Sequence, residues 1–88
     1  MKVVVAEDDR TSSDFIRKGL AQQGHSVESV FDGRDALTFC LYNNCDVLVL
    51  DRMMPGMDGL SVAKALRASG RTMPILFLTS MGDVEDRV

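Results

Sequence analysis

The chain has 88 residues, a length that suits a single small domain. Its composition is ordinary for a globular protein, with 45% hydrophobic and 26% charged residues, and its net charge of −3 argues against nucleic acid as a direct partner of this segment. No apolar run is long enough to span a membrane, and no secretory signal precedes the first apolar run. These properties predict a cytoplasmic protein without a membrane partner, in which Cys40 and Cys45 are reduced hydrophobic residues.

The first part of the chain carries two strand patterns with a helix pattern between them. An aliphatic run at 2–6 predicts a buried parallel strand, and a weaker alternation at 26–31 predicts an edge strand. A helix is expected over 12–23, with an apolar stripe made of Phe15, Ile16 and Leu20. Because hydroxyl oxygens accept well from the free N–H groups at a helix start, its N-cap is expected at Thr11, Ser12 or Ser13.

The second part of the chain continues the alternation of strands and helices. Helices are expected at 34–43 and 58–69, where apolar residues recur with helical spacing, and aliphatic runs predict strands at 46–51 and 75–78. A polar loop and the first turn of a further helix follow. Short loops between alternating strands and helices imply right-handed crossovers, and therefore an α/β fold with a parallel sheet covered on both faces.

Acidic and hydroxyl side chains stand at the ends of three of these strands. Glu7, Asp8 and Asp9 come directly after the first strand. Asp51 ends the third strand, and Thr79 follows the fourth. Because ligands gather at the carboxyl ends of parallel strands, we expect these groups to face one pocket. Such oxygen ligands suit Mg²⁺, a carboxylate beside the cation can attack a phosphoryl group, and a neighbouring hydroxyl can bond a phosphoryl oxygen.

Three sequence blocks carry a resemblance to a known family. They are V-V-V-A-E-D-D at 3–9, V-L-V-L-D-R-M-M-P-G-M-D-G at 47–59, and P-I-L-F-L-T-S at 74–80, which M-G-D-V-E-D-R-V follows. In order and spacing the chain resembles the receiver domain of two-component response regulators over essentially its whole length. Its details are similar to the OmpR/PhoB subgroup of transcription regulators. The resemblance implies a flavodoxin-like (CheY-like) sheet with the strand order 2-1-3-4.

The resemblance also implies the chemistry of the pocket. Asp51 would accept a phosphoryl group from a histidine kinase, which is the implied partner protein. Thr79 would be the switch hydroxyl that responds to the arriving phosphoryl group.

The same resemblance implies a set of metal ligands. Asp8 would bind Mg²⁺ directly, Glu7 would act nearby through water, and the backbone carbonyl of Met53 would complete the protein ligands beside Asp51. Asp9 is expected to be a loop or capping residue rather than a ligand.

The family pattern continues past this sequence with the rest of a fourth helix, a fifth strand that ends in a lysine, and a fifth helix. No lysine here matches that lysine, so we expect residues 1–88 to be the N-terminal part of one receiver domain, truncated and impaired in switching. Without a fifth strand, the strand at 75–78 would be an open edge. We therefore expect self-association through this edge or by exchange of elements between chains. DNA would be contacted only by an output domain absent from this sequence.

More than one function stays open at this point. The first hypothesis is a signalling phosphoacceptor, which is no enzyme beyond its own phosphorylation and dephosphorylation. The second is a binding or oligomerisation module that self-associates without productive phosphotransfer. A third hypothesis is a phosphohydrolase with an aspartyl nucleophile. It is disfavoured because it needs another Asp two residues after Asp51, where this chain has Met53.

Overall fold

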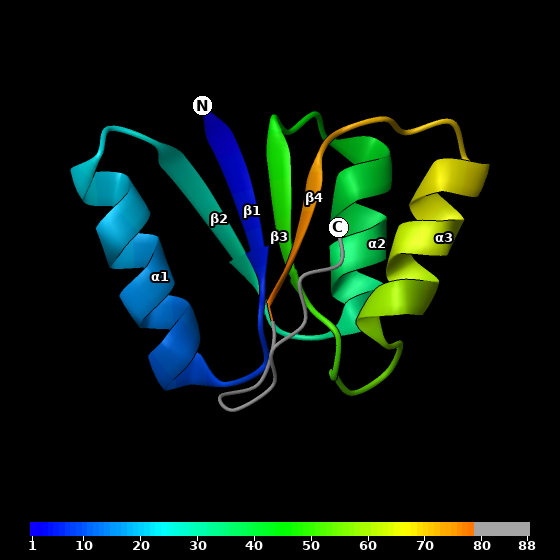
Figure 1. The fold of residues 1–88 in the computed structure, drawn as a ribbon, viewed down its shortest axis with the longest axis horizontal. Coiled ribbons are helices and arrows are strands. Elements are labelled where there is room, and N and C mark those ends of the chain that lie inside the picture. The colour runs from blue at the N-terminus through cyan, green and yellow to red at the C-terminus, as the bar shows by residue number, and fades with distance from the viewer. Residues whose placement is uncertain (79–88) are drawn as a thin grey trace.

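A computed structural model describes residues 1–78, in which strands and helices alternate as predicted (Figure 1). The elements are β1 (Lys2–Ala6), α1 (Arg10–Gln22), β2 (Ser26–Val30), α2 (Gly33–Tyr42), β3 (Val47–Asp51), α3 (Gly59–Ala68) and β4 (Ile75–Leu78). Each element predicted within residues 1–78 is present, with bounds within two residues of the expected ones, and the expected first turn of a further helix lies outside these residues. None of the described helices is long and apolar enough to cross a membrane.

The four described strands form one parallel sheet in the order β2-β1-β3-β4. Val4 of β1 is opposite Glu28 of β2 on one side and Leu48 of β3 on the other. Leu48 is in turn opposite Ile75 of β4. The predicted flavodoxin-like class and strand order are therefore confirmed, and β2 lies at an edge as expected.

Helices cover both faces of the sheet, with α1 on one face and α2 and α3 on the other (Figure 1). Because side chains alternate along a strand, β1 sends Val4 and Ala6 to the α2–α3 face, and Val3 and Val5 to the α1 face. The fully buried residues of the α2–α3 face include Ala36, Cys40, Leu48, Leu50, Val62 and Leu66. This double burial explains why β1 and β3 read as unbroken aliphatic runs.

Helix α1 starts earlier than predicted, and the expected hydroxyl cap is wrong. The N-cap is Asp9, whose Oδ2 accepts from the backbone N of Ser12 at 3.3 Å and from the Ser12 hydroxyl at 2.6 Å. A carboxylate directly ahead of the hydroxyl residues can reach the same free N–H groups, so the helix begins before Thr11 and Ser13. The expectation that Asp9 is a capping residue is confirmed.

The α1 face of the sheet is only partly covered by the described helices. Ile16 and Leu20 pack against the sheet as predicted, but Phe15 is 80% exposed, because one residue along a helix turns the side chain away from the buried stripe. On β4, Leu76 lies opposite Val49 and is 55% exposed. Apolar surface therefore remains open beside α1 and at the β4 edge.

Candidate functional site

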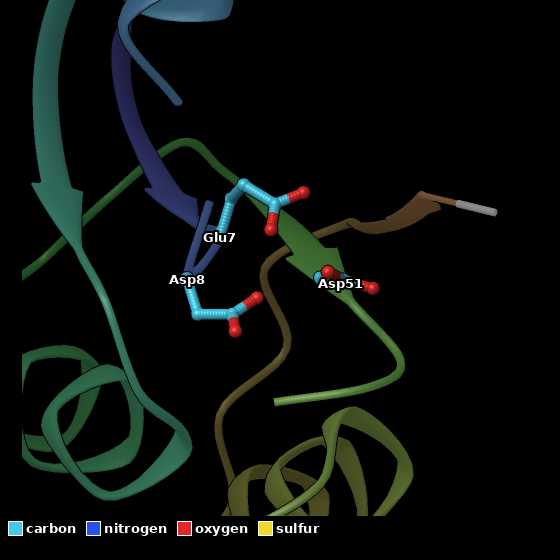
Figure 2. Close-up of side chains that lie close together, drawn as sticks. All are labelled: Glu7, Asp8 and Asp51. Carbon is cyan, nitrogen blue, oxygen red and sulfur yellow. The ribbon is translucent and has the colours of Figure 1, made fainter. Parts of the chain in front are cut away.

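Three carboxylates meet at the carboxyl edge of the sheet, as the sequence predicts. Glu7 and Asp8 follow β1, and Asp51 ends β3 beside it (Figure 2). One oxygen from each side chain lies within 4.8 Å of the others. Parallel pairing sets this arrangement, since Ala6 of β1 is opposite Leu50 of β3 and each strand continues into an acidic residue.

Glu7 is the most buried member of the cluster, with 8% of its surface exposed. Its backbone N donates to the carbonyl of Val30 at 3.1 Å, and its Oε2 accepts from the backbone N of Asp9 at 3.0 Å. The pKa of Glu7 is raised from 4.5 to about 7, chiefly by burial and in addition by the neighbouring Asp51 and Asp8, while the hydrogen bond from the Asp9 N–H opposes the rise. Ionising Glu7 beside the other two carboxylates therefore lowers the stability of the folded chain.

Asp51 is half-buried and its carboxylate is oriented by the loop that follows it. The backbone N of Met53 donates to Asp51 Oδ1 at 3.1 Å. The side chain of Met53 is 74% exposed, so its backbone is the part of the residue held near the carboxylate. The role of the Met53 carbonyl as a ligand stays a prediction.

The loop between β3 and α3 is held in place by two close glycine contacts. The backbone N of Gly33 donates to the carbonyl of Pro55 at 3.2 Å, and a Cβ atom at Gly33 would lie 1.7 Å from the carbonyl oxygen of Met57. The backbone N of Gly59 donates to the carbonyl of Arg52 at 2.9 Å. Sequence reasoning missed both contacts, and its only signal for them was the Asp-Gly pairs, which indicate turns.

The remaining predicted site residue, Thr79, lies outside the described residues together with Ser80. The structure therefore brings Glu7, Asp8 and Asp51 into one cluster and leaves the switch hydroxyl as a prediction.

The donor set of this cluster fits a hard divalent cation. Carboxylate oxygens are the ligands that Mg²⁺ and Ca²⁺ prefer, and Asp8 and Asp51 keep enough exposure for a hydrated ion to approach. The raised pKa of Glu7 is the supporting observation: burial is its main cause, and a cation would offset the further contribution of the neighbouring Asp51 and Asp8.

A parallel α/β sheet with an acidic cluster at its carboxyl edge defines a doubly wound domain of the kind that binds ligands at that edge, and comparison with known proteins narrows this class. The family model of the response regulator receiver domain matches residues 3–88. The chain belongs to this family.

Relatives with curated descriptions agree with this assignment. The chain is 43% identical over 88 residues to the response regulator MprA of Mycobacterium avium (strain 104), and 42% identical to that of Mycobacterium bovis (strain BCG / Pasteur 1173P2). It spans only 39% and 38% of the length of these two relatives, respectively.

Solved structures show the same fold. The receiver domain of the Francisella response regulator 1452 superposes with a TM-score of 0.88 at 37% identity, over 94% of this chain and 69% of that one. The BeF3-activated N-terminal receiver domain of Klebsiella pneumoniae RstA gives a TM-score of 0.86 at 30% identity, over 94% of this chain and 70% of that one.

Proposed function

We propose that this chain is a phosphoacceptor that takes a phosphoryl group from a phosphohistidine of a histidine kinase onto Asp51. The observation that carries the proposal is the meeting of Glu7, Asp8 and Asp51, with carboxylate oxygens within 4.8 Å of one another at the carboxyl edge of the sheet. Three neighbouring carboxylates repel one another, so their presence together favours a function in binding or reaction over a structural role for Asp51. Membership of the receiver family supports the same reaction.

The transfer requires one new bond at Asp51. A carboxylate oxygen forms a bond to phosphorus while the P–N bond of the phosphohistidine breaks, and the departing imidazole keeps the bonding pair and takes up a proton. Because Met53 N–H already donates to Oδ1, we assign the attack to Oδ2. In this proposal the protein is no enzyme for other substrates, and its chemistry is limited to its own phosphorylation and dephosphorylation.

We further propose that the cation is Mg²⁺. Asp8 and Asp51 would bind it directly, the carbonyl of Met53 would complete the protein ligands, and Glu7 would act through water. Mg²⁺, when bound, neutralises the charge that gathers on the phosphoryl oxygens and the carboxylates. Thr79 is proposed as the hydroxyl that contacts the arriving phosphoryl group.

The chain contains no lysine that matches the family's pocket lysine. Lys2 begins β1, at the end of the strand opposite the cluster, while Lys18 and Lys64 lie on α1 and α3. None of the lysines among residues 1–88 therefore takes the role of that pocket lysine. In a longer protein, a cytoplasmic output domain of the OmpR/PhoB kind would make the contact to DNA.

A labelling experiment tests the phosphoacceptor proposal. The chain is incubated with Mg²⁺ and a small acyl phosphate, and an acid-stable, base-labile adduct is sought by mass spectrometry. We expect the adduct in the unmodified chain and in Glu28→Gln, which removes an exposed carboxylate outside the cluster. Asp51→Asn should abolish the adduct, and Asp8→Asn or a chelator should reduce it strongly. An adduct that persists in Asp51→Asn would contradict the proposal.

The second candidate function is a self-associating module whose partner is another copy of this chain. The supporting observation is the open apolar surface at β4, where Leu76 is 55% exposed beside a strand edge that pairs with no other described strand. Association would occur through paired β4 edges or through exchange of elements. Light scattering at micromolar concentration should show a dimer that Leu76→Lys weakens and that Tyr42→Lys, at an exposed site on α2, leaves intact. A monodisperse monomer would rule out this candidate.

A further inference from the structure

A cavity of about 670 Å³ lies between α1 and β2. Its lining includes Arg10, Ser13 and Arg17 from the first eight residues of α1, and Ser29 and Phe31 from β2 and the residue after it. The volume is in the range that binds small molecules, and none of the three clustered carboxylates lines the cavity.

Two residues that line this cavity carry buried hydroxyls without a hydrogen-bond partner among residues 1–78. Ser13 is 1% exposed, and its Oγ has no partner. The Oγ of Ser29 is also buried and without a partner. An unsatisfied buried hydroxyl destabilises the folded state, so two of them on facing elements of one cavity indicate that a polar group belongs between them.

Arg10 supplies a positively charged wall to the same cavity. Its guanidinium lies over the ring of Phe31, with 3.7 Å from Cζ to the ring centroid, and it forms no ion pair with any described residue. The N–H donors of a guanidinium lie in the plane of the group, and stacking on an aromatic ring holds that plane in one orientation. Such a group can donate two parallel hydrogen bonds to an oxyanion.

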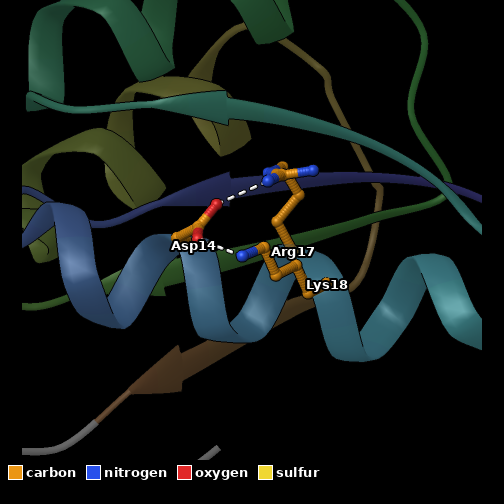
Figure 3. A network of polar contacts seen from close by, with 3 residues as sticks. All are labelled: Asp14, Arg17 and Lys18. Atoms are coloured by element: carbon orange, nitrogen blue, oxygen red, sulfur yellow. Dashed lines mark hydrogen bonds and ion pairs between the residues drawn. The ribbon is translucent and has the colours of Figure 1, made fainter.

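The one acid of α1 that lines the cavity is already neutralised by its neighbours. Arg17 Nη2 lies 2.5 Å from Asp14 Oδ1, and Lys18 Nζ lies 3.0 Å from Asp14 Oδ2 (Figure 3). These two cations lower the pKa of Asp14 and keep it ionised and engaged on both oxygens. The charges that α1 brings to the cavity therefore sum to a positive value.

The acid on the strand side does not change this balance. Glu28 contributes to the lining, but it is adjacent to Ser29 in β2. Because successive side chains of a strand point to opposite faces, the Glu28 side chain leaves the sheet on the face away from Ser29 and α1. The α1 side of the cavity thus presents hydroxyls and guanidinium groups.

We propose that this cavity binds the oxyanion group of a small molecule, a carboxylate or a phosphate, held by Arg10 and by the hydroxyls of Ser13 and Ser29. The hydroxyls donate to the anion, and the guanidinium neutralises its charge. This site is separate from the phosphoacceptor cluster, so the proposal does not depend on the chemistry at Asp51.

The direct test is a titration of the chain followed by backbone amide NMR. Sodium phosphate and sodium acetate are used as separate probes, at constant ionic strength and with a chelator present. We expect saturable shifts in α1 and β2 with at least one probe, and the probe that binds identifies whether phosphate or carboxylate is preferred. Arg10→Gln should weaken binding about tenfold, whereas Lys64→Gln, the same charge change on α3, should alter it less than about twofold. Absence of saturable shifts with both probes would overturn the proposal.

Ser13→Ala separates binding from folding. Because the Ser13 hydroxyl has no partner, its removal should raise the melting temperature, while the affinity for the bound probe falls about threefold or more. A lower melting temperature with unchanged affinity would show that the hydroxyl serves the fold alone and would also overturn the proposal. Ser29→Ala provides an independent repeat of the same comparison.

Discussion

A Cβ atom at Gly59 would lie 2.3 Å from the carbonyl oxygen of Asp51, far inside any normal contact distance. The first residue of α3 therefore touches the backbone of Asp51, the proposed phosphoacceptor. This contact is made by backbone on both sides, so no side-chain movement can relieve a clash there. Asp51 and the start of α3 are consequently fixed relative to each other.

Gly59→Ala should destabilise the fold and displace Asp51. Forcing a methyl group into this contact is expected to cost about 1–3 kcal/mol of unfolding free energy, measured by urea denaturation, and to lower the rate of adduct formation. Gly19→Ala is the matched control, because a Cβ at this exposed position in α1 meets nothing within 4 Å. It should stabilise the protein by about 0.5–1 kcal/mol. Equal stability of the two variants would contradict the structural assignment.

Asp9 caps α1, and its loss should destabilise that helix. Asp9→Ala removes the acceptor for both the N–H and the hydroxyl of Ser12, whereas Asp9→Asn retains an acceptor oxygen. Thermal unfolding followed by circular dichroism should give a lower melting temperature for the alanine variant and a smaller change for the asparagine variant.

The cap also makes a prediction about acid pH. The Ser12 hydroxyl and N–H lower the pKa of Asp9 below its ordinary 3.8. Because the pKa of Asp9 is lower in the folded chain, the cap stabilises the fold when the pH is above the ordinary pKa of 3.8. This stabilisation is lost as the pH falls through the lower pKa of the folded state. The difference in melting temperature between Asp9→Ala and the unmodified protein should therefore shrink under strongly acid conditions.

The order of elements was predictable because the sequence pattern and the burial pattern coincide. Val4 and Leu48 sit in strands that are buried on both faces, so their neighbours are aliphatic without interruption. The meeting of Glu7 and Asp51 followed from parallel topology alone, since each residue continues a paired strand past its last apolar position.

The features that escaped prediction depend on distances that no local pattern encodes. The approach of Gly59 to Asp51 is set by how α3 packs on β3, and the unpaired Ser13 hydroxyl is visible only once α1 lies against β2. The exposure of Phe15 required the exact rotation of α1 on the sheet. A hydrophobic stripe fixes that rotation only to within a residue.

Magnesium should stabilise the folded chain. If the clustered carboxylates bind Mg²⁺ in the folded state alone, excess Mg²⁺ raises the melting temperature, by an amount that grows with its concentration above the dissociation constant. Asp8→Asn should remove most of this increase, while Asp35→Asn, which neutralises an exposed carboxylate in the first turn of α2, should retain it. An equal response of both variants would argue against the clustered site.

Glu7 should make the metal-free protein less stable as the pH rises. Its pKa is raised from 4.5 in its ordinary state to about 7 in the fold, so the folded chain holds this proton more tightly than the unfolded chain does. The stabilisation from this proton is therefore complete at a pH below the ordinary pKa of 4.5, and it is lost as the pH rises towards and through 7. By urea denaturation with a chelator, the loss between about pH 5 and pH 8 should reach about 3 kcal/mol at most.

Glu7→Gln isolates this effect, because glutamine keeps the shape of the side chain but carries no titrating proton. The variant should show little change in stability over the same pH interval, and it should be more stable than the unmodified protein at the upper end. The carboxyl groups with lowered pKa, Asp9, Asp14 and Asp58, remain ionised throughout this interval and therefore contribute no slope of their own. A pH dependence that survives in Glu7→Gln would place the responsible proton on another group.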